Sequence, residues 1–264
     1  MLEIKNIYKT FNPGTINEKV ALNGLSLKLN EGDFVTVIGG NGAGKSTMLN
    51  AVAGVWPVDE GQIIIDGTDV TKLSEYKRAA YLGRVFQDPM TGTAATMGIE
   101  ENLALAKRRG KTRFLRSGIT KAEREEYKEL LKILNLGLED RLTSKVGLLS
   151  GGQRQALTLL MATLQKPKLL LFDEHTAALD PKTAAKVLDI TDRIVNRDHL
   201  TTLMITHNMK DAIAHGNRLI MMMNGKIILD IQGEEKKKLT VKQLLDKFEE
   251  ASGEEFSNDS AILG

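Results

Sequence analysis

Three short runs of almost continuous apolar residues punctuate the chain, and each is followed by a turn or a polar residue. They cover Phe34 to Ile38, Leu169 to Phe172 and Leu203 to Ile205. Runs of this length without polar alternation are typical of strands buried on both faces of a parallel sheet. Helical segments are expected from Lys45 to Ala53 and from about Lys182 to Asn196. This alternation predicts an α/β fold with a mostly parallel sheet.

Two further segments predict antiparallel pairing. One is Gln62 to Asp66, which follows Glu60-Gly61. The other is Leu219 to Met223, which continues through Asn224-Gly225 into Ile227 to Asp230. Asn-Gly between two apolar runs is the strongest short hairpin signal. We therefore expect antiparallel strands beside the parallel sheet.

The strand pattern disappears between about Asp88 and Val146. Thr120 and Glu123 have the spacing of a capping box, and apolar residues follow them at helical intervals: Tyr127, Leu130, Leu131 and Leu134. The segment is therefore expected to form an inserted helical subdomain.

Composition narrows the class of protein. The 264 residues are 42% hydrophobic and 27% charged, with 36 Lys and Arg against 34 Asp and Glu, so the formal charge is +2. This balance argues against a dedicated nucleic-acid binder. Cysteine is absent, which excludes disulfides and thiolate metal sites. The N-terminus lacks the apolar stretch of an export signal, and no run approaches the roughly 20 residues that cross a bilayer.

The run after the first apolar segment matches the phosphate-binding pattern G-x-x-x-x-G-K-[ST], between a strand and a helix as that pattern requires. Glycines let successive backbone N–H groups converge on phosphates, and the helix N-terminus adds a favourable dipole. Lys45 is expected to reach the β and γ phosphates, and Ser46 to offer its hydroxyl to Mg²⁺. The predicted ATP-binding residues of this segment are Gly39, Asn41, Gly42, Ala43, Gly44, Lys45, Ser46 and Thr47.

A pair of carboxylates, Asp173 and Glu174, ends the second apolar run. Ligands of open α/β sheets bind at the carboxyl ends of the strands. Asp173 suits a role on Mg²⁺, directly or through water. Glu174 is expected to orient and deprotonate the water that attacks the γ-phosphate.

A second glycine-rich nest, Leu149-Ser150-Gly151-Gly152-Gln153, stands at the start of another expected helix, Gln153 to Leu164. One ATP does not need two such nests. From Leu2 to about Ile231 the chain resembles the ATP-binding-cassette (ABC) ATPases, whose signature sequence is this Leu-Ser-Gly-Gly-Gln. In that family the signature of one subunit closes over the γ-phosphate held by the other subunit.

The resemblance implies further site residues, which follow in the order expected of the family. Gln87 is implied to monitor the metal, the attacking water and the permease contact. His207 is implied to hold the γ-phosphate, and Asp180 to communicate across the dimer. Phe11 falls where the family places an aromatic ring against adenine, although an ordinary strand residue is the alternative. With Glu174 these residues complete the expected set: Gln87 and His207 as catalytic groups, Ser46, Gln87 and Asp173 on the metal, and Ser150, Gly151, Gly152, Gln153 and Asp180 on ATP.

The resemblance also implies the domain organisation. Residues 1–87 and 147–231 are expected to form a RecA-like P-loop NTPase core with an N-terminal antiparallel β subdomain, and 88–146 the helical subdomain. Residues 232–264 are expected to be a short tail, helical where Leu244, Leu245 and Phe248 share one side. We expect a single ABC ATPase domain.

Three departures from the family pattern stand out: Gly40 and His175 replace common prolines, and Ala177 replaces a frequent serine. None removes a phosphate, metal or base ligand. The run after the signature and the segment Glu174 to Ala178 resemble a subgroup of bacterial importer ATPases, some of them linked to tryptophan or tyrosine uptake. The expected partners are a second copy of the chain, a membrane permease and an extracellular substrate-binding lipoprotein, which would place the chain on the cytoplasmic face of the membrane.

Two alternatives remain open from sequence. An exporter motor would also use a detached ATPase. A non-transport cassette would act on nucleic acid or the ribosome, but only about a hundred residues separate Lys45 from Ser150, without the heptads of a coiled coil, and no second cassette is present. The basic stretch from Lys107 to Arg113, with Arg116, is the best case for nucleic acid; a solvated helix end or loop near anionic lipid explains it more simply.

Overall fold

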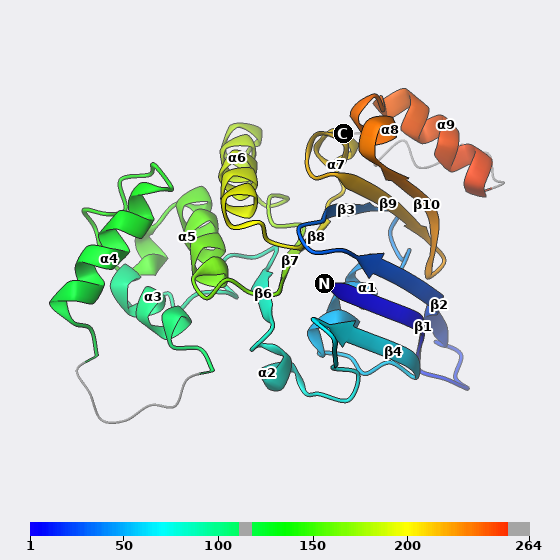
Figure 1. The fold of residues 1–264 in the computed structure, drawn as a ribbon, viewed down its shortest axis with the longest axis horizontal. Coiled ribbons are helices and arrows are strands. Elements are labelled where there is room, and N and C mark those ends of the chain that lie inside the picture. Colours follow the sequence, from blue (N-terminus) through cyan, green and yellow to red (C-terminus); the bar gives the residue numbers. More distant parts are fainter. Residues whose placement is uncertain (111–117, 253–264) are drawn as a thin grey trace.

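The computed structural model describes residues 1–110 and 118–252. Two sheets lie on one side of the molecule, and helices α3, α4 and α5 lie on the other (Figure 1). The larger sheet has six strands in the order β10-β9-β3-β8-β7-β6. Their bounds are Phe34–Ile38 for β3, Leu82–Val85 for β6, Leu169–Asp173 for β7, Thr202–Ile205 for β8, Arg218–Met223 for β9 and Lys226–Gln232 for β10.

Pairing in this sheet is parallel except at one edge. Strand β8 lies between β3 and β7, with Leu203 opposite both Val35 and Leu171. The Asn-Gly hairpin predicted from sequence forms as β9 and β10, but β9 also pairs in parallel with β3. The hairpin therefore extends the parallel sheet. The carboxyl ends of β3, β8 and β7 meet at one edge, which is where the phosphate loop and the acidic pair were predicted to lie.

The smaller sheet is antiparallel, in the order β2-β1-β4-β5. Its strands are β1 (Leu2–Phe11), β2 (Lys19–Leu29), β4 (Glu60–Ile65) and β5 (Thr68–Asp69). Leu2 and Ile4 face the core. The register of β1 with β2 shifts between Ile4 and Ile7, and Asn6, inside this shift, has a φ of 44°. The bulge returns Ile7 to the buried face. Together the two sheets and the helices confirm the predicted α/β class with antiparallel and helical additions.

The helices cover the six-stranded sheet and extend beyond it. They are α1 (Lys45–Ala53), α2 (Glu75–Arg78), α3 (Ile99–Lys107), α4 (Lys121–Lys132), α5 (Gly151–Thr163), α6 (Pro181–Asp198), α7 (Met209–Ala214), α8 (Gly233–Lys237) and α9 (Val241–Ser252). The capping box at the start of α4 is present, since Thr120 Oγ1 accepts from the Glu123 amide and Glu123 accepts from the Thr120 amide. In the described part of the chain, no helix is long and apolar enough to span a bilayer.

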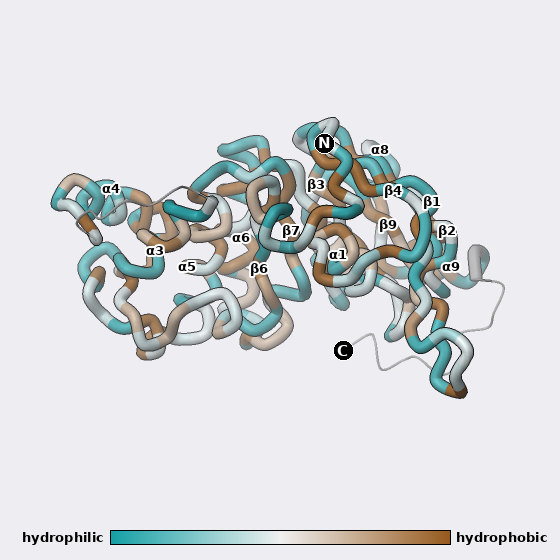
Figure 2. The backbone as a smooth tube through the Cα atoms, turned by 90° about the horizontal axis from the view of Figure 1, so that it is seen from below, coloured by the Kyte–Doolittle hydropathy of each residue, from teal (hydrophilic) through white to brown (hydrophobic). Residues whose placement is uncertain are grey.

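Apolar stretches gather around β3, β7 and α1, and polar ones follow the outer loops (Figure 2). Arg78 fixes α1 in this core. Its guanidinium is buried and donates to the carbonyls of Ala51 and Val52 at 2.6 and 2.9 Å. These carbonyls belong to the last turn of α1, where the helix has no further backbone N–H groups to bond them. The helix that begins at the phosphate loop is therefore anchored at its far end.

Candidate functional site

The phosphate loop joins β3 to α1. Two of its positions require glycine because backbone carbonyl oxygens of neighbouring strands lie very close to them. Gly39 has φ 148°, and a Cβ there would lie 2.3 Å from the carbonyl oxygen of Met222. Gly44 has φ 100°, and a Cβ there would lie 2.5 Å from the carbonyl oxygen of Ala21. Only glycine combines these backbone conformations with such close contact. The loop is thus pressed between β9 and β2.

Lys45 opens α1 and lies almost fully buried beneath the loop. Its Nζ donates to the carbonyl oxygens of Gly39 at 2.6 Å and Gly40 at 3.1 Å. Burial lowers the pKa of Lys45, and the nearby carboxylates of Glu174 and Asp173 oppose that shift. The ammonium is held at the junction between the loop and the acidic pair.

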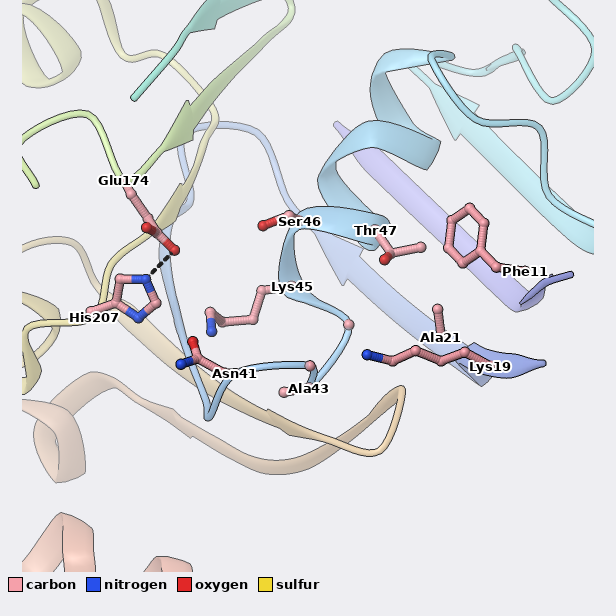
Figure 3. A pocket seen from close by; sticks show the side chains of 12 residues that line it. Phe11, Lys19, Ala21, Asn41, Ala43, Lys45, Ser46, Thr47, Glu174 and His207 are labelled. Atoms are coloured by element: carbon pink, nitrogen blue, oxygen red, sulfur yellow. Dashed lines mark ion pairs between the residues drawn. The ribbon is translucent and has the colours of Figure 1, made fainter. Parts of the chain in front are cut away.

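A cavity of about 290 Å³ opens in front of the loop (Figure 3). Ten predicted site residues line it: Phe11, Asn41, Gly42, Ala43, Gly44, Lys45, Ser46, Thr47, Glu174 and His207. Lys19 and Ala21, both on β2, line it as well and were missed from sequence. Lys19 Nζ extends toward the loop, and a Cβ on Gly42 would lie 3.2 Å from it. The structure therefore adds a second cation to the cavity.

The aromatic end of the cavity is Phe11, the last residue of β1. Its ring meets that of Trp56 edge-on, with centroids 5.0 Å apart. Lys9 Nζ lies 5.7 Å from the Phe11 centroid on the same strand. Phe11 is partly buried, so one part of the ring packs on Trp56 while the residue still borders the cavity.

Glu174 and His207 close the opposite end. Glu174 Oε1 lies 2.6 Å from His207 Nε2, and the Glu174 side chain is 11% exposed. The Glu174 amide donates to the carbonyl of Ile205 at 3.1 Å, which continues the pairing of β7 with β8 by one residue. The two side chains are thus positioned by the ends of neighbouring strands.

Asp173, at the end of β7, has a cationic neighbour that the sequence did not reveal. Burial raises the pKa of Asp173, and Arg84, 3.6 Å away on β6, opposes this shift. Arg84 also donates to Asn50 Oδ1 at 2.7 Å, and Asn50 donates to the carbonyl of Ser46 at 2.8 Å. The only signal for Arg84 in the sequence was a charged residue inside a strand. Arg84 links the carboxylate to the helix of the phosphate loop.

Ser46 and Asp173 supply a hydroxyl and a carboxylate, the hard oxygen ligands that Mg²⁺ prefers. Mg²⁺ is commonly held by one or two such groups together with the phosphates of its nucleotide. This donor set therefore fits Mg²⁺. Gln87 does not line the cavity: it is exposed, two residues beyond β6.

The second glycine nest lies away from this cavity. Ser150 caps α5, with Oγ accepting from the Gln153 amide at 3.3 Å and the Ser150 amide donating to Gln153 Oε1 at 3.2 Å. A Cβ on Gly152 would lie 2.2 Å from Thr183 Cγ2, so glycine lets the start of α5 pack closely against α6 there. Asp180 is exposed and caps α6 by accepting from Thr183 at 3.1 Å. These residues and Gly151 do not share a cavity with Lys45.

The basic stretch is partly described. Lys107 pairs with Glu126, and Arg108 lies 2.9 Å from Glu123. Lys111, Arg113 and Arg116 lie outside the described residues. Lys107 and Arg108, at the end of α3, are paired with carboxylates of α4. Arg109, which is also described, is partly buried, and burial lowers its pKa.

Comparison with known proteins agrees with this arrangement. A family model described as ABC transporter matches residues 22–177. The chain is 47% identical over 256 residues to a tyrosine transport ATP-binding protein of Clostridioides difficile, covering 95% of this chain and 100% of that protein. It is 33% identical over 234 residues to the phosphonates import ATP-binding protein PhnC of Treponema denticola, covering 87% and 89% of the two chains.

A solved structure shares the fold. It is described as the dimeric structure of a post-hydrolysis state of the ATP-binding cassette MJ0796 bound to ADP and Pi, with a TM-score of 0.74 and 30% identity over 88% of this chain and 98% of that one. The family match, these relatives and the cavity at the phosphate loop agree. The chain belongs to the ABC transporter family, as an ATP-binding subunit of the ATP-hydrolysing class.

Proposed function

We propose that this chain binds MgATP in the cavity of Figure 3 and uses its hydrolysis to drive import of an amino acid, most specifically tyrosine, through a separate permease. The observation that carries the proposal is the convergence of three strand ends, which places Lys45, Glu174 and His207 around one cavity beside Asp173. The 47% identity to a tyrosine transport ATP-binding protein supports the choice of substrate.

The residues that line the cavity, Ala21 apart, have roles that their positions support. Phe11 packs on adenine, and Lys19 with Lys45 neutralises the phosphates. The loop from Gly39 to Gly44 offers backbone N–H groups, and Thr47 borders the phosphates at the start of α1. Ser46 and Asp173 hold Mg²⁺, which when bound neutralises charge on the phosphates. Gln87 joins them only if its loop moves toward the cavity.

Hydrolysis needs a base and a cation beside the γ-phosphate. Glu174 takes a proton from the attacking water, since its carboxylate borders the cavity beyond Lys45. His207 Nε2 lies 2.6 Å from Glu174 Oε1. The imidazole thus positions Glu174 and also holds a γ-phosphate oxygen. Positioning and charge stabilisation of this kind account for most of the catalysis in phosphoryl transfer.

The signature residues complete the site from a second copy. Ser150, Gly151, Gly152 and Gln153 lie outside the cavity of their own chain, and Asp180 stands exposed nearby. In a head-to-tail dimer they face the γ-phosphate of the partner, and each nest contributes the N-terminus of α5 to an anion. The dimeric state in the description of the MJ0796 structure supports this arrangement.

The permease is the membrane partner, and a substrate-binding lipoprotein outside the cell delivers the amino acid. The chain then lies on the cytoplasmic face, held by the permease.

Uptake of labelled tyrosine tests this function. Cells whose chromosomal copy carries Lys45→Ala or Glu174→Gln should lose high-affinity tyrosine uptake, while uptake of an unrelated sugar stays unchanged. Lys237→Met, a surface change far from the cavity, is the matched control and should take up tyrosine normally. Normal tyrosine uptake in both site variants, with intact permease levels, would show that the chain powers something else.

A further inference from the structure

His175 follows Glu174 directly, yet its side chain points into the interior and is 2% exposed. The centroid of its ring lies 4.4 Å from that of Phe172 on β7, at an angle of 38°. Its Nε2 lies 3.2 Å from Oγ1 of Thr191 on α6. The imidazole therefore connects the end of the catalytic strand to a neighbouring helix.

Thr191 determines which ring nitrogen carries the proton. The Thr191 hydroxyl has a single proton, which it donates to the carbonyl of Val187 at 2.9 Å. Its oxygen is left to accept, so Nε2 of His175 is the donor. Nε2 carries a proton in this tautomer and in the imidazolium alike, so the donor contact to α6 does not depend on the charge of the ring.

The backbone of Glu174 explains why such an anchor is needed. Glu174 has φ 48°, a conformation that non-glycine residues rarely adopt. Such residues are strained, and they persist when their surroundings fix them on several sides. The Glu174 amide is held by Ile205, and the Glu174 carbonyl accepts from Ala177 at 3.0 Å. The side chain of the next residue, His175, attaches this segment to a different element, α6.

We infer that His175 is a positioning residue for the catalytic base, fixing the backbone of Glu174 through its packing on Phe172 and its hydrogen bond to Thr191. The inference rests on the proposed role of Glu174. His175 lines no part of the nucleotide cavity, so it acts on turnover and not on ATP binding. It differs in this from Lys45 and Phe11, which border the cavity.

Two substitutions of similar size separate the hydrogen bond from packing. His175→Gln keeps an N–H group at about the reach of Nε2, whereas His175→Leu fills the site without a donor. His175→Leu should lower kcat at least about tenfold, because small misplacement of a reacting group is expensive in rate. ATP affinity, measured by calorimetry without turnover, should change less than about twofold. His175→Gln should recover kcat to within about threefold of the unmodified protein.

The partner of the bond gives an independent test. Thr191→Val removes the acceptor and should lower kcat in the same way as His175→Leu, again without loss of ATP affinity. The double variant should be no slower than the worse single one, since both changes break one contact. If His175→Leu fails to fold, Thr191→Val and His175→Gln still test the hydrogen bond. The inference predicts a reduced kcat for Thr191→Val and a near-normal kcat for His175→Gln.

Glu174→Gln distinguishes failure of this inference from failure of the proposed function. If Glu174→Gln is slow while His175→Leu and Thr191→Val keep normal kcat, the positioning role is wrong and the base assignment stands. If Glu174→Gln turns over normally, Glu174 is not the base, and the part of the proposed function on which this inference rests fails. Equal kcat for His175→Gln and His175→Leu, both reduced, would overturn the hydrogen bond as the cause.

Discussion

Oε1 of Glu174 lies 2.6 Å from Nε2 of His207, across the ends of two adjacent parallel strands. The register Asp173 opposite Ile205 brings the following residues to the same edge of the sheet. A carboxylate that contacts an imidazole at this distance can exchange a proton with it or with a water beside it. The relationship couples the expected base to the expected γ-phosphate ligand.

The first prediction concerns Glu174→Gln. The amide keeps the size and polarity of the side chain but cannot accept a proton from water, so turnover should fall by about two to four orders of magnitude. ATP affinity should be unchanged, and ATP-bound dimers should accumulate in size-exclusion chromatography. Turnover close to that of the unmodified protein would remove Glu174 from the role of base.

The second prediction concerns Phe11→Ala. Loss of a ring that stacks on adenine should weaken ATP binding by about 1 kcal/mol, or about fivefold in Kd, with little change in single-turnover rate. Calorimetric titration measures the affinity directly. Trp56 is the single tryptophan of the chain and lies against Phe11, so its emission should change when the unmodified protein binds ATP.

Phe11→Tyr keeps the ring and is the control, with near-normal affinity expected. Should Phe11→Ala bind ATP as tightly as Phe11→Tyr, the ring serves only to pack on Trp56.

The third prediction concerns the buried Lys236 of α8. Its Nζ donates to the carbonyls of His215 and Gly216, and burial lowers its pKa to about 8 from the ordinary 10.5. Between these values the unfolded chain binds more protons than the folded one, so the free energy of unfolding contributed by Lys236 rises with pH. The rise is up to about 3 kcal/mol between pH 8 and 10.5.

Urea unfolding of the unmodified protein and of Lys236→Met at pH 7, 8, 9 and 10 isolates this effect. The stability of the unmodified protein relative to the variant should increase over the series. Lys237→Met, a change at an exposed neighbour paired with Glu234, should show a constant difference. A constant difference for Lys236→Met as well would mean that the lysine keeps an ordinary pKa in the fold.

Residues that lie close together in sequence were the most predictable part of the site. Lys45 and Ser46 follow directly from the loop pattern, and the apolar run before Asp173 places the acidic pair at a strand end. Lys19 and Arg84 could not be predicted, because each reaches the site from a strand distant in sequence. Their contribution depends on how β2 and β6 lie beside the loop.

Strand β1 shows a different limit. Its alternation of apolar and polar residues is broken at Asn6, where a bulge restores Ile7 to the core. A period of two cannot be followed through a bulge from sequence alone. Gly152 shows what a motif alone leaves open. The motif explains this glycine as part of an anion-binding nest, and the structure adds close packing against Thr183 as a second explanation. The sequence identifies the residue but does not separate these two explanations.

The central claim is that ATP is hydrolysed at a site shared by two chains, with Lys45 from one and Ser150 from the other. Mixing Lys45→Ala protein with Ser150→Arg protein tests it most directly, with the permease present if the isolated chains associate weakly. Each variant alone should be inactive, and the mixture should regain about a quarter of normal ATPase activity if dimers form at random and the sites act independently. Full activity of Ser150→Arg alone, or no recovery in mixtures shown to contain mixed dimers, would contradict the account.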